Sequence, residues 1–285
     1  MPGPFALDRV REAVVGTRFA TVDHVVETGS TNADLLAAAA DGDGEGRVLV
    51  ADHQTAGRGR RGRTWDDGPG RTLLVSVLLR PPAASVDLVT PAVAVAAAEA
   101  VEAVVGVAPS IKWQNDLVAS VDGGPERKLA GILAEASWPP GADIASGWPR
   151  GRERTRVPVV VGMGLNVSAD GRAEELDPIA VALDELTGPA GAPAPTREAV
   201  VAAWLVALDR WYPAALDDDD RDRLWAAWRD RSATLGRRVR VDLGVDDLTG
   251  TAVDVTDGGQ LVVRTDEGVD RVLAVGDVTH VRAAG

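Results

Sequence analysis

The pattern of apolar residues changes near residue 234, and this change constrains the fold more than any other feature. Beyond it, the segments RRVRVDL, LTGTAVDVT, GQLVVRT and VDRVLAVGDVTHVR alternate apolar and polar residues, with short turns such as TDGG and DEG between them. Alternation of this kind over about 50 residues predicts a small all-β domain built as a barrel. We therefore expect two domains, residues 1–232 and residues 233–285.

Upstream of that change, predicted strands alternate with predicted helices. Periodicity predicts strands at 21–27, 47–54, 72–80 and 157–167, and helices at 88–105, about 196–216 and about 218–231. The segments SIKWQNDLVA and RKLAGILAEAS are expected to pair as a hairpin through the turn VDGGPE. Thr31 and Asp34 match a helix-start capping pattern. The mixture indicates an α+β fold, and the Pro, Gly and charged residues of 138–156 predict an exposed loop.

Composition removes several classes of protein. The chain has no cysteine, which excludes disulfides and thiolate chemistry, and its three histidines are too scattered to suggest a zinc site. The N-terminus lacks a signal-peptide core, and the most apolar stretch is interrupted by Pro91, Glu99 and Glu102. A net charge of −13 argues against bulk electrostatic binding to nucleic acid or an anionic membrane. We expect a cytoplasmic protein.

Against this acidic background, the heptad GRGRRGR at 57–63 concentrates four arginines in one loop. Guanidinium groups suit carboxylate and phosphate oxygens, and glycines let the backbone approach a ligand closely. The heptad lacks the Gly-Lys-Ser/Thr of a P-loop and the strand–GxGxxG–helix context of a dinucleotide site. Two interpretations remain open from the heptad alone, a clamp for a small anion and a solvated patch for RNA or a partner.

Three further motifs bear on that choice. KWQND at 112–116 places polar and charged groups beside a strand, KLAGILAE at 128–135 sets Lys128 ahead of an apolar strand, and GMGLN at 162–166 ends a strand of valines. Each taken singly is more simply explained as turn residues or a strand edge with a solvated lysine.

Together with GSTN and HQTAGRGRRGRTW, and in this order, these motifs closely resemble the biotin–protein ligase family. The resemblance runs from residue 24 to residue 167 and includes the β-rich tail. It implies a catalytic domain similar to the core of a class II aminoacyl-tRNA synthetase, a mixed sheet with helices, followed by an SH3-like barrel. It also implies two steps: biotin and ATP form biotinyl-5′-adenylate, and the activated acyl group then passes to a lysine of a biotin carboxyl carrier domain of an acyl-CoA carboxylase.

The resemblance also implies roles for individual residues. Ser30, Thr31 and Asn32 would hold the ureido ring of biotin, and Gln54 would make a further polar contact. Hydroxyl and amide groups can both donate and accept hydrogen bonds, as a neutral ureido group requires. Gly131 would allow the ligand to approach its strand closely.

The charged motifs would carry the chemistry. Arg58, Gly59 and Arg60 match the positions that contact biotin and its adenylate, while Arg61 and Arg63 would meet phosphates or stabilise the loop. Lys128 matches the lysine that contacts the biotin carboxylate and the α-phosphate, and we expect it to stabilise charge in the transition state.

The remaining predicted contacts concern the nucleotide and the incoming amine. Asn115 and Asp116 would lie near nucleotide, Mg²⁺ and the substrate lysine, and Asp116 would orient that amine or accept its proton. Asn166 would contact the nucleotide or Mg²⁺. Trp65 would pack against the arginine loop or cover adenine. Lys128, Arg60 and Asp116 are thus the predicted catalytic residues, and the metal ligands stay unassigned.

Three alternatives remain open at this stage: a lipoate–protein ligase, an RNA-binding module and a biotin-binding protein without catalysis. The arginine heptad and the β-rich tail favour biotin, and the acidic surroundings of the heptad disfavour RNA. About 20 residues precede the first predicted strand, whereas a winged helix-turn-helix would need roughly 60. We therefore expect a ligase without a repressor function. The sequence leaves open a monomer or a weak homodimer.

Overall fold

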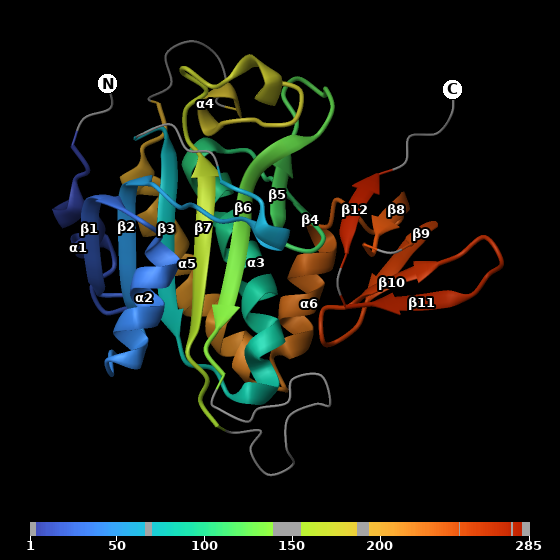
Figure 1. The fold of residues 1–285 in the computed structure, drawn as a ribbon, viewed down its shortest axis with the longest axis horizontal. Coiled ribbons are helices and arrows are strands. Elements are labelled where there is room, and N and C mark those ends of the chain that lie inside the picture. The colour runs from blue at the N-terminus through green and yellow to red at the C-terminus, as the bar shows by residue number, and fades with distance from the viewer. Residues whose placement is uncertain are drawn as a thin grey trace.

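The computed structural model describes residues 4–65, 70–138, 155–186, 194–244, 246–274 and 276–280. Most of the loop expected at 138–156 lies outside these residues. A seven-stranded mixed sheet forms the centre of the larger part of the chain, in the order β1-β2-β3-β7-β6-β5-β4 (Figure 1). Its strands are β1 (Thr21–Thr28), β2 (Arg47–Gln54), β3 (Thr72–Leu79), β4 (Ser110–Lys112), β5 (Asp116–Ala119), β6 (Arg127–Ala136) and β7 (Val159–Asn166).

The pairing of these strands makes the sheet mixed. Strands β1 and β2 run parallel, and the other neighbouring pairs run antiparallel. The parallel pair is possible because a helix connects its strands and carries the chain back to the starting edge. That helix is α2 (Thr31–Ala40).

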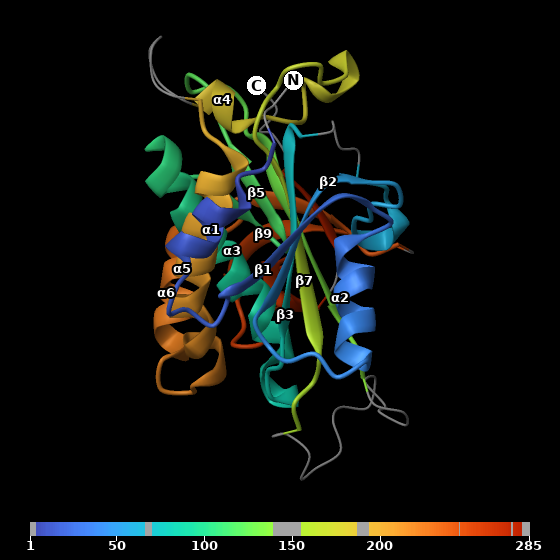
Figure 2. The same ribbon diagram turned by 90° about the vertical axis from the view of Figure 1, so that its left-hand side faces the viewer.

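Helices cover both faces of the sheet. Helix α2 lies on one face, and α1 (Leu7–Ala13), α3 (Val86–Val105), α5 (Arg197–Leu216) and α6 (Arg221–Asp230) lie on the other (Figure 2). The short α4 (Leu183–Leu186) follows β7. Among the described helices, α2 alone covers its face of the sheet, so much of that face is left for loops that leave the strand ends.

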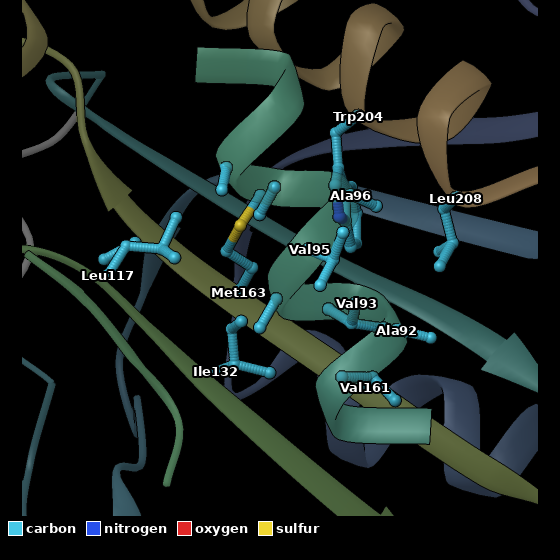
Figure 3. Close-up of a cluster of buried hydrophobic side chains, with 14 of the residues drawn as sticks. Ala92, Val93, Val95, Ala96, Leu117, Ile132, Val161, Met163, Trp204 and Leu208 are labelled. Atoms are coloured by element: carbon cyan, nitrogen blue, oxygen red, sulfur yellow. The ribbon is translucent and has the colours of Figure 1, made fainter. Parts of the chain in front are cut away.

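The core lies between the sheet and the four-helix face. Small side chains of α3, among them Ala92, Val93 and Ala96, pack between the sheet residues Ile132 and Met163 and helix α5 (Figure 3). Alanine and valine let α3 approach its neighbours closely, and the bulkier Trp204 of α5 fills the remaining volume.

Two segments, Ala83–Val105 and Arg197–Leu216, are long and apolar enough to cross a membrane by length and composition. In the structure, however, 67% and 56% of their most apolar windows are buried inside the protein. Their apolar character is therefore accounted for by the core that they form with the sheet.

The tail forms a second sheet, five-stranded and antiparallel, in the order β11-β10-β9-β8-β12. Its strands are β8 (Arg238–Asp242), β9 (Asp247–Val255), β10 (Leu261–Arg264), β11 (Asp270–Leu273) and β12 (Asp277–His280). The alternation predicted from sequence is present, since Val239 and Val241 are buried while Arg238 and Arg240 are exposed.

Three local expectations need correction. The segment 110–119 is two short strands, β4 and β5, joined by a tight turn, and the Trp113–Gln114 peptide bond in that turn is cis. Helix α1 has no counterpart among the predicted helices. Helix α2 begins with Ser30 as its N-cap and not with Thr31, because the Thr31 hydroxyl lies against Gln54 of β2 and Ser76 of β3.

Candidate functional site

One cavity of about 590 Å³ gathers nearly all of the residues singled out in the sequence. It lies on the face of the large sheet that α2 covers, with Asn32 against Gly162 of β7. Fourteen of the fifteen predicted site residues line it: Ser30, Thr31, Asn32, Gln54, Arg58, Gly59, Arg60, Arg63, Trp65, Asn115, Asp116, Lys128, Gly131 and Asn166. The fifteenth, Arg61, has a side chain outside the described part of the structure.

Polar side chains form a connected hydrogen-bond network at one end of the cavity, and Thr31, Asn32 and Gln54 of this network line the cavity. The Thr31 amide donates to Gln54 Oε1 over 2.8 Å, and the Thr31 hydroxyl lies 2.6 Å from Ser76 Oγ. Ser76 in turn donates to Asn32 Oδ1 over 2.6 Å, and Asn32 Nδ2 donates to Glu135 Oε2 over 2.8 Å and to the Leu133 carbonyl over 3.2 Å. We call this set the polar end.

The polar end is buried and its geometry is fixed. Thr31, Asn32 and Ser76 are each less than 5% exposed. A buried polar network of this kind is rigid when every member is satisfied. In the described part of the chain, Ser30 makes no capping bond to α2, so its hydroxyl is the one best able to meet a ligand.

The arginine loop folds as a tight hairpin beside the cavity mouth. Gly59 N donates to Arg63 O over 2.7 Å, Trp65 N donates to Gly57 O over 3.1 Å, and a 3₁₀ turn spans Arg60–Gly62. Gly62 closes the turn with φ of +72°, a conformation that disfavours side chains. Arg58, Arg60 and Arg63 of this hairpin line the cavity.

Four described cations that line the cavity are each paired with a group from another segment of the chain. Arg58 pairs with Glu135 at 3.1 Å, Arg60 Nη1 donates to Asn115 Oδ1 over 3.3 Å, and Arg63 pairs with Asp277. Lys128 Nζ lies 2.9 Å from Asp116 Oδ1. These four pairs, together with Lys112, form the cationic end of the cavity.

Two paired glycines of the sheet form part of the cavity wall. Gly131 and Gly164 are direct partners in the β6–β7 ladder, and the Trp65 indole lies on both. A Cβ on Gly164 would come within 2.4 Å of the indole, closer than real Cβ contacts allow. Trp65 also lies beneath Lys128, whose Nζ is 5.3 Å from the ring centroid. The glycines therefore let Trp65 position the lysine.

Asn115 and Asn166 are both hydrogen-bonded to the protein. Asn115 Nδ2 donates to the Ile132 carbonyl over 2.6 Å, while its Oδ1 accepts from Arg60. Asn166 Nδ2 donates to the carbonyls of Val181 and Lys128. A ligand can therefore meet Asn166 through its oxygen, and it must displace Arg60 to reach Oδ1 of Asn115.

The small β-rich tail supplies one wall of the cavity. Asp242 and residues 276–279 line it, and Gln114 Nε2 donates to Ala274 O over 3.1 Å. Trp113 donates from Nε1 to Gly259 O over 2.9 Å. Burial lowers the pKa of His280 at this interface, the positive charges of Lys112 and Arg237 lower it further, and Glu126 opposes the change. The tail is thus part of the site.

Sequence reasoning missed Ser76, Glu135 and the wall from the tail. Ser76 is the one polar residue inside the apolar strand segment LLVSVLL, and Glu135 is a carboxylate in the apolar strand KLAGILAEA. A buried polar group requires a partner, so both positions carried a signal. The partners themselves come from distant segments and needed the structure.

Comparison with known proteins agrees with this geometry. The model of the biotin/lipoate A/B protein ligase family matches residues 35–138, and that of the biotin protein ligase C-terminal domain matches residues 234–281. A biotin–[acetyl-CoA-carboxylase] ligase from Mycobacterium tuberculosis is 38% identical over 279 residues, which cover 94% of this chain and 91% of the relative.

Two further relatives extend the comparison. A ligase of the same name from Paracoccus denitrificans is 31% identical, over 84% of this chain and 92% of the relative. The solved structure of a point mutant of the Aquifex aeolicus biotin protein ligase, in complex with biotin, superposes with a TM-score of 0.71 at 25% identity and covers 92% of this chain and all of that one. The chain is therefore a member of the biotin protein ligase family.

Proposed function

We propose that this enzyme activates biotin with ATP and transfers the biotinyl group to a lysine of a biotin carboxyl carrier domain. The observation that carries the proposal is the cavity itself, which is lined both by the buried polar residues Ser30, Thr31 and Asn32 and by a group of arginine and lysine side chains. Biotin has a matching polarity, with a neutral ureido ring at one end and a carboxylate at the other.

In the first step, a carboxylate oxygen of biotin attacks the α-phosphorus of ATP. A new O–P bond forms the acyl-adenylate, the bond from the α-phosphorus to the bridging oxygen breaks, and pyrophosphate leaves. Two anions must approach each other for this reaction, so fixed cations lower its barrier. We assign Lys128 to the charge that builds at the carboxylate and the α-phosphate, and Arg58 and Arg60 to the ligand anions.

In the second step, the neutral amine of a carrier lysine attacks the acyl carbon. An amide bond forms, the bond to AMP breaks, and the amine gives up a proton. A lysine amine with an ordinary pKa of ~10.4 is mostly protonated at neutral pH, so a carboxylate beside it assists. Asp116 lines the cavity next to Lys128 and is our candidate for that role.

Mg²⁺ would enter this site with the nucleotide. In the residues that the structure describes, no cluster of three or more acidic or histidine side chains could hold a metal. Mg²⁺ is usually bound through one or two carboxylates together with substrate phosphates, and Asp116 with Asn115 Oδ1 fits that pattern. We propose these two oxygens as the protein contacts of the ion and Asn166 as a nucleotide contact.

We also propose a cytoplasmic ligase without a repressor role, with a catalytic domain of residues 1–232 and a tail domain of residues 233–285. A net charge of −13 supports the absence of DNA binding, because phosphate contacts depend on basic surfaces. The expected partner is the carrier domain of an acyl-CoA carboxylase.

The test is biotin-dependent exchange of labelled pyrophosphate into ATP, with lipoate as a parallel acid. Exchange with biotin and not with lipoate, followed by labelling of one lysine on an added carrier domain, is the expected result. Exchange with lipoate alone would assign the enzyme to the lipoate branch. Absence of exchange by folded protein with either acid would overturn the adenylation mechanism.

A further inference from the structure

One carboxylate contacts two residues that line the cavity, Asn32 and Arg58, and has no part in the mechanism above. Glu135 lies on β6, four residues beyond Gly131. Its Oε1 lies 3.1 Å from Arg58 of the arginine loop, and its Oε2 accepts from Asn32 Nδ2 over 2.8 Å. A single side chain therefore joins a residue of the cationic end to a residue of the polar end.

The direction of the hydrogen bonds makes Glu135 the acceptor in which the network ends. Ser76 donates to Asn32 Oδ1, and the Thr31 hydroxyl lies within hydrogen-bonding distance of both Ser76 Oγ and Gln54 Oε1. Asn32 then donates both of its amide hydrogens, one to Leu133 O and one to Glu135. Arg58 donates to the same carboxylate from the other side. Because an ionised carboxylate only accepts hydrogen bonds, it can serve both donors at once.

Ser76 and Gly162 hold the oxygen side of the Asn32 amide, and Glu135 accepts from its nitrogen side. A Cβ on Gly162 would come within 2.4 Å of Asn32 Oδ1, so only glycine leaves room for that oxygen. With Oδ1 held between Gly162 and Ser76, Nδ2 must point toward β6. Asn32 is 4% exposed, so loss of the Glu135 acceptor would leave a largely buried amide hydrogen without its partner.

We propose that Glu135 is a positioning residue that couples the arginine loop to the polar end of the cavity. It holds the Asn32 amide in the orientation that a ligand meets, and it seats Arg58 at the cavity mouth. The proposal rests on the proposed function, since it concerns how this site holds the acid substrate. It assigns no contact with the reacting atoms to Glu135.

Variants of Glu135 can separate its two contacts. Glu135→Gln keeps an oxygen that can accept from Asn32 but removes the charge that pairs with Arg58. Glu135→Ala removes both contacts. Glu99→Gln is the matched control. Glu99 lies on helix α3, outside the lining of the cavity, and its carboxylate is similarly shielded and pairs with Arg210 of α5 at 3.0 Å.

The readout is steady-state biotin-dependent pyrophosphate exchange, with KM for biotin and kcat determined separately. We expect Glu135→Ala to raise KM about tenfold and Glu135→Gln about threefold, with kcat changed less than about threefold, because lost uniform binding raises KM alone. Coupling through Arg58 predicts non-additivity, so adding Glu135→Gln to Arg58→Ala should produce no further change.

The outcomes distinguish this proposal from the function on which it rests. Absence of exchange in the wild-type enzyme would overturn the proposed function. If the wild-type enzyme catalyses exchange, two results would overturn the coupling alone. One is a KM for biotin in both Glu135 variants equal to that of Glu99→Gln, and the other is a fully additive effect of Glu135→Gln in the Arg58→Ala background. If Glu135→Ala does not fold, Glu135→Gln and the double variant still decide the question.

Discussion

The two ends of the cavity are built in opposite ways. The polar end is buried, with Thr31, Asn32 and Ser76 almost inaccessible and bonded to one another. The cationic end is open, with the side chains of Arg58 and Arg63 52% and 63% exposed. The polar end is already arranged when a ligand binds, whereas at the cationic end the ligand must replace carboxylates of the protein that pair with the cations.

This difference separates recognition from chemistry. A pre-organised end selects a ligand at little cost in conformational entropy. Exposed ion pairs contribute only about 0–1 kcal/mol each, so ligand anions can replace the carboxylates that pair with Arg63 and Lys128. The arginine loop can then reorganise without loss of the fold.

The largest effect is expected at the cationic end, from Lys128→Ala. Loss of a fixed cation beside the reacting anions should lower kcat of biotin adenylation by roughly 10²–10³-fold, with a smaller change in KM for biotin. Lys112→Ala is the matched control, since Lys112 is the other lysine of the chain and also lines the cavity. Equal losses in both variants would mean that general positive charge, and not the place of Lys128, drives the step.

Two glycine substitutions should separate the ends. Gly162→Ala pushes on Asn32, and Gly164→Ala pushes on Trp65 and through it on Lys128. We expect Gly162→Ala to raise KM for biotin about tenfold and Gly164→Ala to lower kcat about tenfold, since overpacking typically costs about 1–3 kcal/mol. Gly44→Ala, where a Cβ meets nothing within 4 Å, is the control. Identical kinetic profiles for the two variants would remove the distinction between the ends.

A smaller effect is expected from Ser76→Ala at the centre of the polar end. The substitution removes the Ser76 donor from the buried Asn32 Oδ1, so the free energy of unfolding should fall by about 1–3 kcal/mol. Urea denaturation measures this change. An unfolding free energy equal to that of the wild type would show that the Ser76 hydrogen bonds do not stabilise the fold.

Much of this architecture follows from local sequence patterns. The boundaries of α3 and α5 agree with the expected helices because Gly106 ends the first in a left-handed conformation and Thr196 caps the second through its hydroxyl. The alternation of the tail predicted its strands, and α6 falls within the helix expected at about 218–231.

The remainder depends on tertiary contacts. The spacing of Thr31 to Asp34 predicts a capping role for Thr31, but Gln54 from β2 and Ser76 from β3 compete for its hydroxyl. The polar end draws on α2, β2, β3 and β6, and no local pattern joins Ser76 to Glu135. The acceptors at the cationic end also come from distant segments, and Asp277 lies more than 200 residues beyond the arginine that it pairs with.

Hydrogen exchange of the backbone amides, with and without biotin and a non-hydrolysable ATP analogue, tests the contrast between the ends most directly. We expect protection from exchange to increase strongly at residues 57–65 when the ligands bind. We expect a small change at residues 30–34, where the Thr31 and Asp34 amides are already hydrogen-bonded. A large gain at residues 30–34 with no change at residues 57–65 would contradict this expectation.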